Sequence, residues 1–272
     1  MVAETALDRI VADVRRRLDT YTEAPGLEEA AQKAVEARRR MGLRSLNSAL
    51  SKPGLALIAE CKKASPSAGV IREDFDATAL AGAYAAGGAA AISVVTEPDS
   101  FRGDPRWLVD IRPTVDLPVL RKDFIVTRRQ LFETAILGAD AVLLIARILD
   151  EEALADLLRA AAELELEVLL EIFADEDPAT AVASGAPIIG VNARDLANFE
   201  VRLDWVETIA AELPADRVRV AESGIHSLGD LDRLRGVGYD AFLVGEHLVR
   251  SNDPEAAVRE LIGRGDGDGQ RC

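Results

Sequence analysis

The sequence predicts an α/β fold in which eight parallel strands close into one (β/α)8 barrel. Short runs rich in β-branched residues alternate with longer runs whose apolar residues recur at helical spacing, which is typical of a parallel sheet. The length of 272 residues is usual for one such barrel. No linker divides the chain into domains. The same alternation of strands and helices is also compatible with an open, doubly wound sheet.

The expected strands follow one another at intervals that each accommodate a helix. They are Leu55–Glu60, Ala90–Val95, Val119–Arg121, Ala141–Ile145, Glu167–Ile172, Ile188–Val191, Arg217–Ala221 and Ala241–Val244. The run Asp150–Leu164 is an example of the helical pattern between them. Glycine-rich turns such as Gly87-Gly88 and Gly236-Val237-Gly238 mark the boundaries.

Residues 1–50 lie outside this alternation and are predicted to form a helical extension. Leu7–Tyr21 and Leu27–Arg40 have the pattern of two amphipathic helices, and a loop is expected over Leu43–Lys52. The extension is expected either to cap the bottom of the barrel or to flank its top. The barrel would then occupy residues 51–263, and residues 264–272 have the composition of a flexible tail.

Composition argues against several classes of protein. The net charge of −15 disfavours binding to nucleic acid or to an anionic membrane. No run of about 18 apolar residues could span a bilayer. The N-terminus carries acids among its bases and lacks the apolar region of a signal peptide. Two cysteines are too few for a disulfide framework. We expect a cytoplasmic protein whose partner is a small molecule.

Polar residues end nearly every predicted strand. In a barrel the loops that follow the strands converge on one face, so these side chains should meet there. Any one of them alone would be read as a solvated loop residue, but six such strand ends together indicate an active site. The residues are Glu60, Lys62, Ser65, Lys122, Phe124, Glu171, Asn192, Arg194, Glu222, Ser223 and Glu246.

The last two strand ends have the features of a phosphate site. Glu222-Ser223-Gly224 follows the seventh strand and Gly245-Glu246 follows the eighth. Barrels of this type commonly bind phosphate there through backbone N–H groups, and glycine lets the backbone approach closely. We therefore expect a small, phosphorylated, anionic substrate. The alternative is that both glycines only make tight turns.

These motifs resemble those of the indole-3-glycerol phosphate synthase family, which belongs to the ribulose-phosphate-binding barrels of tryptophan biosynthesis. The most specific motifs are Glu60-Cys61-Lys62-Lys63-Ala64-Ser65-Pro66-Ser67 and Lys122-Asp123-Phe124. The others are Ala139-Asp140-Ala141-Val142-Leu143-Leu144-Ile145, Leu169-Leu170-Glu171, Gly190-Val191-Asn192-Ala193-Arg194, Ala221-Glu222-Ser223-Gly224-Ile225 and Leu243-Val244-Gly245-Glu246. They occur in family order from about residue 55 onward.

The resemblance implies a lyase that converts 1-(2-carboxyphenylamino)-1-deoxy-D-ribulose 5-phosphate to indole-3-glycerol phosphate, CO2 and water, without a metal or organic cofactor. It implies Lys122 as general acid at the ketone and Glu171 as its carboxylate partner and base. It also implies that Glu60 and Lys62 serve the dehydration and bind substrate. Ser65 and Arg194 would bind the substrate carboxylate, Asn192 would bind a ribulose hydroxyl, and Phe124 and Leu143 would contact the aromatic ring. The phosphate would be bound by Ser223, Gly224, Gly245 and Glu246. Which lysine acts at which step stays open.

Three positions depart from the commonest family pattern. Ala68 stands where a lysine often follows Ser-Pro-Ser, and Val95 stands where a leucine often precedes the threonine. His247 stands where the family usually has a small polar residue, near the expected phosphate. Cys61 lies between two site residues but should face the other side of its strand, as a core residue. His226 and His247 do not form a metal-ligand pattern.

Several alternatives stay open at this point. They are a sister phosphate-binding barrel such as phosphoribosylanthranilate isomerase, a Schiff-base aldolase, and an inactive or secondary-pathway paralogue. The required Cys/Asp pair of the isomerase is missing from matching positions, and the intact set of Glu60, Lys62, Lys122 and Glu171 argues against decay. A monomer and association with other tryptophan-pathway enzymes are both compatible with the sequence.

Overall fold

A closed barrel of eight parallel strands forms the centre of the molecule, as the sequence predicts. The computed structural model describes residues 5–21, 25–173, 178–195 and 200–264. The strands follow in chain order around the barrel, and the last pairs with the first, Ala56 opposite Ala241. They are β1 (Ala56–Cys61), β4 (Ala91–Val95), β5 (Val119–Lys122), β6 (Ala141–Ile145), β7 (Glu167–Phe173), β8 (Ile188–Asn192), β9 (Val218–Glu222) and β10 (Ala241–Val244).

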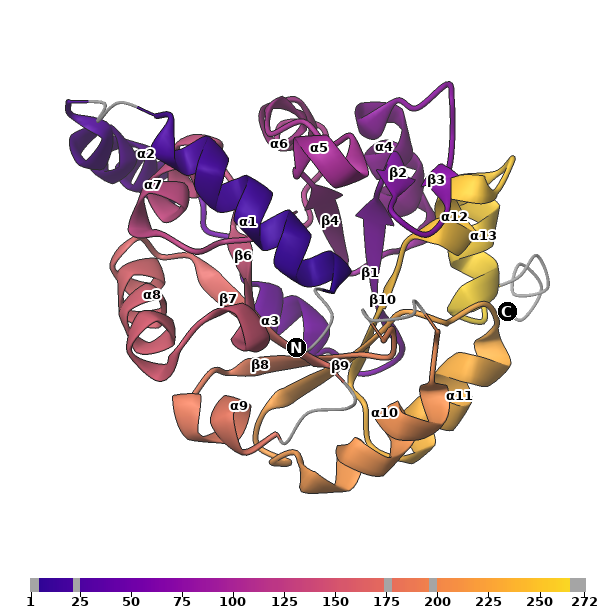
Figure 1. Ribbon diagram of the computed structural model, residues 1–272. Coiled ribbons are helices and arrows are strands. Elements are labelled where there is room, and N and C mark those ends of the chain that lie inside the picture. The colour runs from indigo at the N-terminus through magenta and orange to yellow at the C-terminus, as the bar shows by residue number, and fades with distance from the viewer. Residues whose placement is uncertain (1–4, 22–24, 174–177, 196–199, 265–272) are drawn as a thin grey trace.

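Helices surround the strands on all sides (Figure 1). The helices that follow β1 to β6 are α4 (Ala77–Gly87), α5 (Pro98–Phe101), α6 (Arg106–Ile111), α7 (Arg128–Ile136), η1 (Ala146–Ile148) and α8 (Glu151–Glu163). Those that follow β7 to β10 are α9 (Ala179–Ser184), α10 (Leu203–Ile209), η2 (Ala210–Glu212), α11 (Leu228–Gly236), α12 (Glu246–Arg250) and α13 (Pro254–Leu261). Among the described residues no helix is both long and apolar enough to cross a bilayer.

The predicted strands all exist, and several run one residue further at their C-terminal end. Lys122, Phe173, Asn192 and Glu222 each end a strand instead of starting a loop. A side chain on a strand has a fixed direction, because alternate residues point to opposite faces. These residues are therefore aimed into the barrel by regular secondary structure.

Alternation along the strands divides the apolar residues into two cores. One lies inside the barrel and includes Ile58, Leu120 and Leu169. The other lies between the strands and the helices and includes Leu57 and Leu170. Residues adjacent in the sequence thus belong to different cores, and the inward-facing set is the one that leads to the site.

The N-terminal extension contacts both ends of the barrel. Helix α1 (Ala6–Asp19) contributes Leu7 and Val11 to the interior core, and Leu46 and Leu50 of α3 (Leu46–Leu50) join the same core. In Figure 1, α1 crosses in front of the strands and α3 lies behind them. Helix α2 (Leu27–Met41) packs along α7 on the outside. The two expected placements of the extension, bottom and top, are both realised.

The prediction of a loop over Leu43–Lys52 is wrong for its central part, where α3 forms. The Ser45 hydroxyl caps this helix by accepting a hydrogen bond from the Ser48 N–H at 3.0 Å. The Glu167 carboxylate accepts bonds from the Ser45 hydroxyl and the Asn47 N–H, both at 2.7 Å. This tertiary anchor to the start of β7 explains why so short a helix is stable.

Another small element missing from the prediction follows β1. Strands β2 (Ala64–Ser65) and β3 (Gly69–Val70) pair antiparallel, with Ser65 opposite Gly69. The hairpin holds the Ser-Pro-Ser segment at the mouth of the barrel.

Candidate active site

Four ionisable side chains close the inside of the barrel at its C-terminal end. They come from alternate strands, β1, β5, β7 and β9, and are Glu60, Lys122, Glu171 and Glu222. Side chains from alternate strands form one layer inside a barrel of this type. The three carboxylates are almost fully buried. Burial of so many charges is costly unless they pair, so their pairing defines the site.

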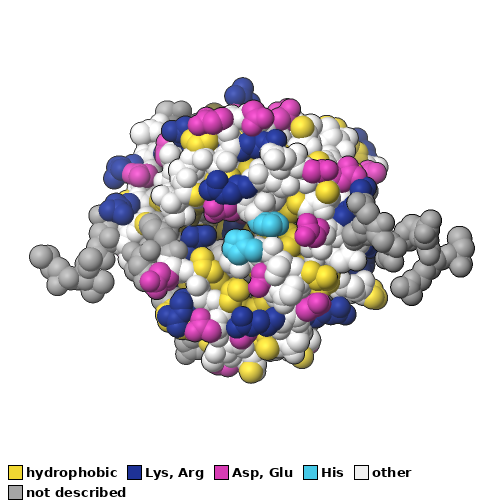
Figure 2. Space-filling view, turned by 90° about the vertical axis from the view of Figure 1, so that its right-hand side faces the viewer, with side chains coloured by type: hydrophobic (Ala, Val, Ile, Leu, Met, Phe, Trp, Pro, Cys, Tyr) yellow, Lys and Arg dark blue, Asp and Glu magenta, His cyan; other side chains and the backbone are white. Residues whose placement is uncertain are grey.

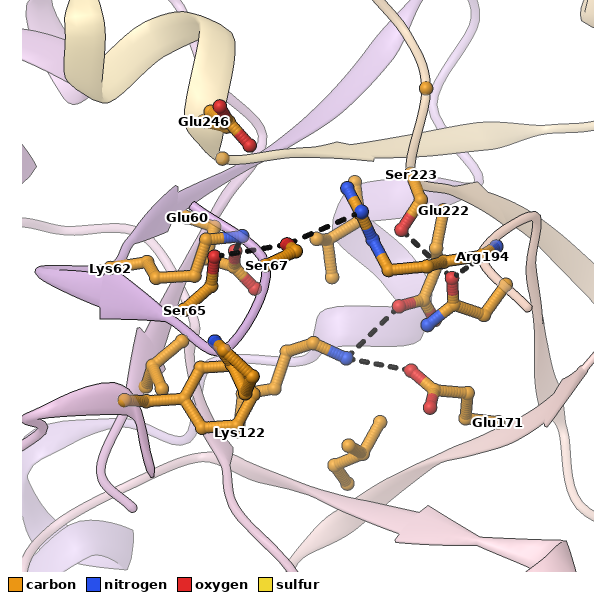
Figure 3. Close-up of a pocket in the computed structure, with 18 of the residues that line it drawn as sticks. Glu60, Lys62, Ser65, Ser67, Lys122, Glu171, Arg194, Glu222, Ser223 and Glu246 are labelled. Atoms are coloured by element: carbon orange, nitrogen blue, oxygen red, sulfur yellow. Dashed lines mark hydrogen bonds and ion pairs between the residues drawn. The ribbon is translucent and has the colours of Figure 1, made fainter. Parts of the chain in front are cut away.

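Lys122 lies between two carboxylates (Figure 3). Its Nζ donates to Glu171 Oε2 at 2.7 Å and to Glu222 Oε2 at 3.0 Å. Burial disfavours the ammonium form, but the carboxylates of Glu171, Glu222 and Glu60 outweigh it and raise the pKa of Lys122. The lysine is therefore protonated at neutral pH, as a general acid must be before it acts.

The carboxyl group of Glu222 is only partly compensated by its neighbours. Its Oε1 atom is buried without a hydrogen-bond partner in the described part of the chain. Burial raises the pKa of Glu222 to about 8, against the attraction of Lys122 and with the repulsion of Glu171. Glu222 therefore holds a proton over much of the neutral range, and Lys122 then faces one full carboxylate charge instead of two.

A second lysine–carboxylate pair lies on another side of the cavity. Lys62 Nζ is 2.7 Å from Glu60 Oε1. Burial alone would raise the pKa of Glu60, but Lys62 and Lys122 overcome this and lower it. Glu60 is therefore ionised, and the site contains two separate acid–base pairs.

Two glycines make room for these carboxylates. A Cβ atom on Gly245 would lie 2.3 Å from Glu60 Oε1, and one on Gly190 would lie 2.2 Å from Glu222 Oε1. Any larger residue would displace the carboxylates, so the absence of a side chain is required here. For Gly245 this requirement comes in addition to the predicted approach of the backbone to a phosphate.

Hydrogen-bonded polar groups surround this layer at the rim. Arg194 Nη1 donates to Ser67 Oγ at 3.4 Å, and Ser67 Oγ lies 3.3 Å from Ser65 Oγ. Asn192 Oδ1 accepts from the Arg194 N–H at 3.0 Å and from the Ser223 hydroxyl at 2.8 Å. Arg194 and Ser65, which sequence analysis assigned to the substrate carboxylate, thus line the same cavity.

Apolar side chains also line the cavity. Phe124 and Leu143 line it, as expected, together with Phe101, whose ring centroid is 6.0 Å from that of Phe124. Leu7 and Ile10 of α1 also line the cavity. Sequence analysis missed Phe101 and the helix α1 residues, because an apolar residue in a loop or on an amphipathic helix gives no signal that distinguishes it from core.

The expected phosphate residues lie at the cavity too, with one revision. Ser223 and Gly224 adopt left-handed backbone angles, φ 71° and 76°, and they line the cavity with Gly245 and Glu246. The Glu246 side chain accepts a bond from Arg250 Nε at 2.9 Å. Glu222 was grouped with these residues from sequence, but its side chain points into the barrel and bonds to Lys122. It belongs with the carboxylates.

A buried polar network supports the strand that carries Lys122. Arg121 and Asp123 flank the lysine and face away from the barrel interior. Thr96 Oγ1 donates to Asp123 Oδ2 at 2.6 Å, and Arg121 Nη2 donates to the same oxygen at 2.8 Å. Asp123 Oδ1 accepts from the Phe124 N–H at 2.8 Å. The backbone on both sides of Lys122 is thus fixed by side chains.

Cys61 is a core residue, as predicted. It is fully buried between β1 and α4, and its Sγ lies 3.7 Å from the carbonyl oxygen of Ala77. Burial raises the pKa of this thiol, which makes it a poor nucleophile. Within the described residues, no group of three or more His, Cys, Asp and Glu side chains could hold a metal ion.

Fold and site together define a barrel enzyme with paired lysines and carboxylates at its C-terminal mouth, the usual position of catalytic residues in this fold. Residues 7–261 match the family model of indole-3-glycerol phosphate synthase. The chain belongs to that family.

Similar proteins agree with this assignment. The indole-3-glycerol phosphate synthase of Geobacillus thermodenitrificans is 44% identical over 97% of this chain and 99% of its own. That of Mycobacterium avium is 42% identical over 97% and 96%. Among solved structures, 3-hexulose-6-phosphate synthase from Salmonella typhimurium has a TM-score of 0.62 at 18% identity, covering 77% of this chain and 97% of that one. That likeness concerns the fold alone.

Proposed function

We propose that the protein is an indole-3-glycerol phosphate synthase acting in tryptophan biosynthesis. It closes the indole ring of 1-(2-carboxyphenylamino)-1-deoxy-D-ribulose 5-phosphate and releases CO2 and water. The observation that carries this proposal is Lys122, held between Glu171 and Glu222 at the mouth of a barrel of this family. A cytoplasmic location and a small-molecule partner belong to the same proposal.

Ring closure needs a proton donor at the ketone. The ring carbon that bears the carboxylate attacks the ketone carbon, and the ketone oxygen gains a proton as the new C–C bond forms. Lys122 donates this proton, and the Glu171 carboxylate stabilises its ammonium form. A proton from solvent restores the ammonium group after the reaction, which takes up one proton overall. Loss of CO2 then restores the electron pair of the broken C–C bond to the ring system. The apolar wall of Phe124 and Leu143 holds the aromatic ring next to Lys122.

Dehydration needs a second acid and base. The hydroxyl group made from the ketone leaves as water, which requires a proton on its oxygen and loss of a proton elsewhere. The Lys62–Glu60 pair supplies both functions on the other side of the cavity, since Lys62 is a donor and Glu60 is ionised. In this scheme Lys122 acts at ring closure and Lys62 acts at dehydration. The alternative is the reverse order.

The ends of the substrate are bound by different groups. Arg194 and Ser65 hold the carboxylate, Asn192 holds a ribulose hydroxyl, and the backbone of Ser223, Gly224, Gly245 and Glu246 holds the phosphate. No metal or organic cofactor takes part in this scheme.

Residues 1–50 belong to the same unit as the barrel of residues 51–263, because α1 lines the cavity and α3 packs into the interior core.

The test is product formation by the purified chain. Incubation with the carboxyphenylamino-deoxyribulose phosphate should generate indole fluorescence with stoichiometric release of CO2. The dephosphorylated substrate should react far less efficiently, because charge-assisted bonds at a preorganised site are strong. Borohydride should trap no covalent adduct. Absence of fluorescence from a folded chain would favour the inactive-paralogue alternative, and a trapped adduct would favour an aldolase.

A further inference from the structure

Two histidines lie side by side at the mouth of the cavity, and the proposed chemistry uses neither. His226 lies in the loop after β9 and His247 lies on α12. Their ring centroids are 6.0 Å apart in an edge-to-face arrangement. Figure 2 shows the two rings adjacent at the surface hollow. Because each comes from a different loop, their meeting at one place is a property of the folded barrel.

The pair lies next to the proposed phosphate loops. His226 is two residues after Gly224, His247 is two residues after Gly245, and all four residues line the same cavity. The backbone N–H of His226 donates to Asp230 Oδ2 at 3.0 Å. That amide is therefore committed to the start of α11, and the imidazole is the part of His226 that can bind a ligand.

The charge balance of the cavity leaves a need for further donors. The acidic side chains that line it are Glu60, Glu171, Glu222 and Glu246. Asp123 also borders the cavity, but its carboxylate is paired with Arg121 behind the strand. The lysines and arginines of the cavity, within the described residues, are Lys62, Lys122 and Arg194. Both lysines already donate to carboxylates, and the Ser223 hydroxyl donates to Asn192. The proposed substrate nevertheless brings a carboxylate and a phosphate into this cavity.

We propose that His226 and His247 form a two-imidazole clamp on the substrate phosphate. Each ring donates an N–H to an outer phosphate oxygen, in addition to the backbone donors of the two loops. The clamp makes the enzyme select a phosphorylated over a hydroxyl-terminated substrate. This inference rests on the proposed function, and it extends that function by assigning two side chains to the phosphate.

The experiment compares His226→Ala, His247→Ala and the double variant with the wild-type chain. Two readouts are used: steady-state kinetics with the carboxyphenylamino-deoxyribulose phosphate, and direct binding of inorganic sulfate by calorimetry. A hydrogen bond to a charged group is strong enough that each substitution should raise KM and the sulfate Kd about tenfold. The fall in kcat should stay within about threefold, because the reacting atoms lie at the lysines.

Arg235→Gln is the matched control. Arg235 is exposed at the C-terminal end of α11, the end away from His226, and does not line the cavity. Its replacement therefore removes one positive charge without touching the phosphate loops. Sulfate affinity and KM should change less than about twofold in this variant, which separates direct contact from long-range electrostatics. Circular dichroism and thermal melting show whether each variant is folded. If the double variant does not fold, the two single variants provide the test.

The proposal is overturned if sulfate affinity and KM of the folded variants stay within twofold of wild type. It is also overturned if the variants lose as much activity on the dephosphorylated substrate as on the phosphorylated one, or if the wild-type chain binds no sulfate. Failure of the proposed function looks different, because turnover by the wild type would then be absent while sulfate binding, and its loss in the variants, could still be measured.

Discussion

Lys122 is the residue on which the proposed ring closure depends most directly. Replacement by methionine keeps most of the side-chain length but removes the proton donor that lies between Glu171 and Glu222. General acids typically contribute about 10²–10⁴-fold, so kcat of Lys122→Met should fall by at least that much. Substrate affinity should fall less, since both anionic ends keep their ligands. Single-turnover kinetics with a separate binding measurement checks this.

Lys122→Arg is the matched comparison. It keeps the positive charge between the two carboxylates, but guanidinium is a poor proton donor because its pKa is above about 12. We expect the arginine variant to be nearly as slow as the methionine variant. If either variant kept the chemical step within a few-fold of wild type, Lys122 would be a binding residue, and the acid at the ketone would be Lys62.

Individual site residues could be predicted from sequence where a strand end fixes their direction. Glu60, Lys122, Glu171 and Asn192 were placed at the cavity on this basis, and the structure brings them together. Glu222 was assigned to the wrong neighbours, because its position beside Ser223 and Gly224 in sequence hides the opposite directions of consecutive side chains on a strand. The need for glycine at 190 could not be foreseen without knowing where the Glu222 carboxylate lies.

At the scale of elements, the segment from β5 to α7 is held by the network behind Lys122. Thr96 is fully buried on the neighbouring loop, and its hydroxyl donates to Asp123 while accepting from Arg121 Nε at 3.2 Å. Thr96→Val removes this hydroxyl at nearly constant shape. Asp123 and Arg121 keep their bonds to each other, so the cost is that of a lost hydrogen bond to a charged group, about 1.5–3 kcal/mol. Thermal stability should therefore fall by several degrees. If the network positions Lys122, kcat should also fall, about tenfold, with little change in KM.

Thr96→Ser keeps the hydroxyl and serves as the control. It should restore most of kcat even if the lost methyl group lowers the melting temperature. Thermal melting and the separate values of kcat and KM for both variants distinguish the two roles. A valine variant that melts earlier but turns over like wild type would show that the network serves stability alone.

Elements with strong periodicity were predictable, and elements that depend on tertiary anchors were not. The eight strands were found because buried parallel strands are continuous apolar runs. The hairpin of β2 and β3 is too short to show an alternation. Helix α3 depends on the Glu167 carboxylate from a strand far away in sequence. Such a contact becomes visible only in the folded barrel.

At the scale of the whole molecule, closure of the barrel is what assembles the charged layer. Its members come from β1, β5, β7 and β9, and only the pairing of β10 with β1 brings the first and last of these strands around one interior. The stability of the whole fold therefore compensates the electrostatic cost of three buried carboxylates, two of them paired with Lys122 and one with Lys62. Part of the stability of the molecule is given up for function in this way.

This cost predicts how global stability depends on pH. Burial raises the pKa of Glu222 to about 8, compared with 4.5 for the free side chain. Between these values the folded chain binds more protons at this site than the unfolded chain, so the stability that Glu222 contributes is complete below about pH 4.5 and is lost as pH rises toward about 8.

Glu222→Gln has nearly the same shape but cannot titrate. The free energy of unfolding of the variant, relative to wild type, should therefore increase with pH, by an amount on the order of a few kcal/mol. Urea unfolding of both ligand-free proteins at pH 5, pH 6.5 and pH 8 (values chosen to span roughly the range of the shifted group) measures this difference. A difference that stayed constant or decreased with pH would mean that Glu222 is ionised throughout, with Lys122 compensating its burial in full.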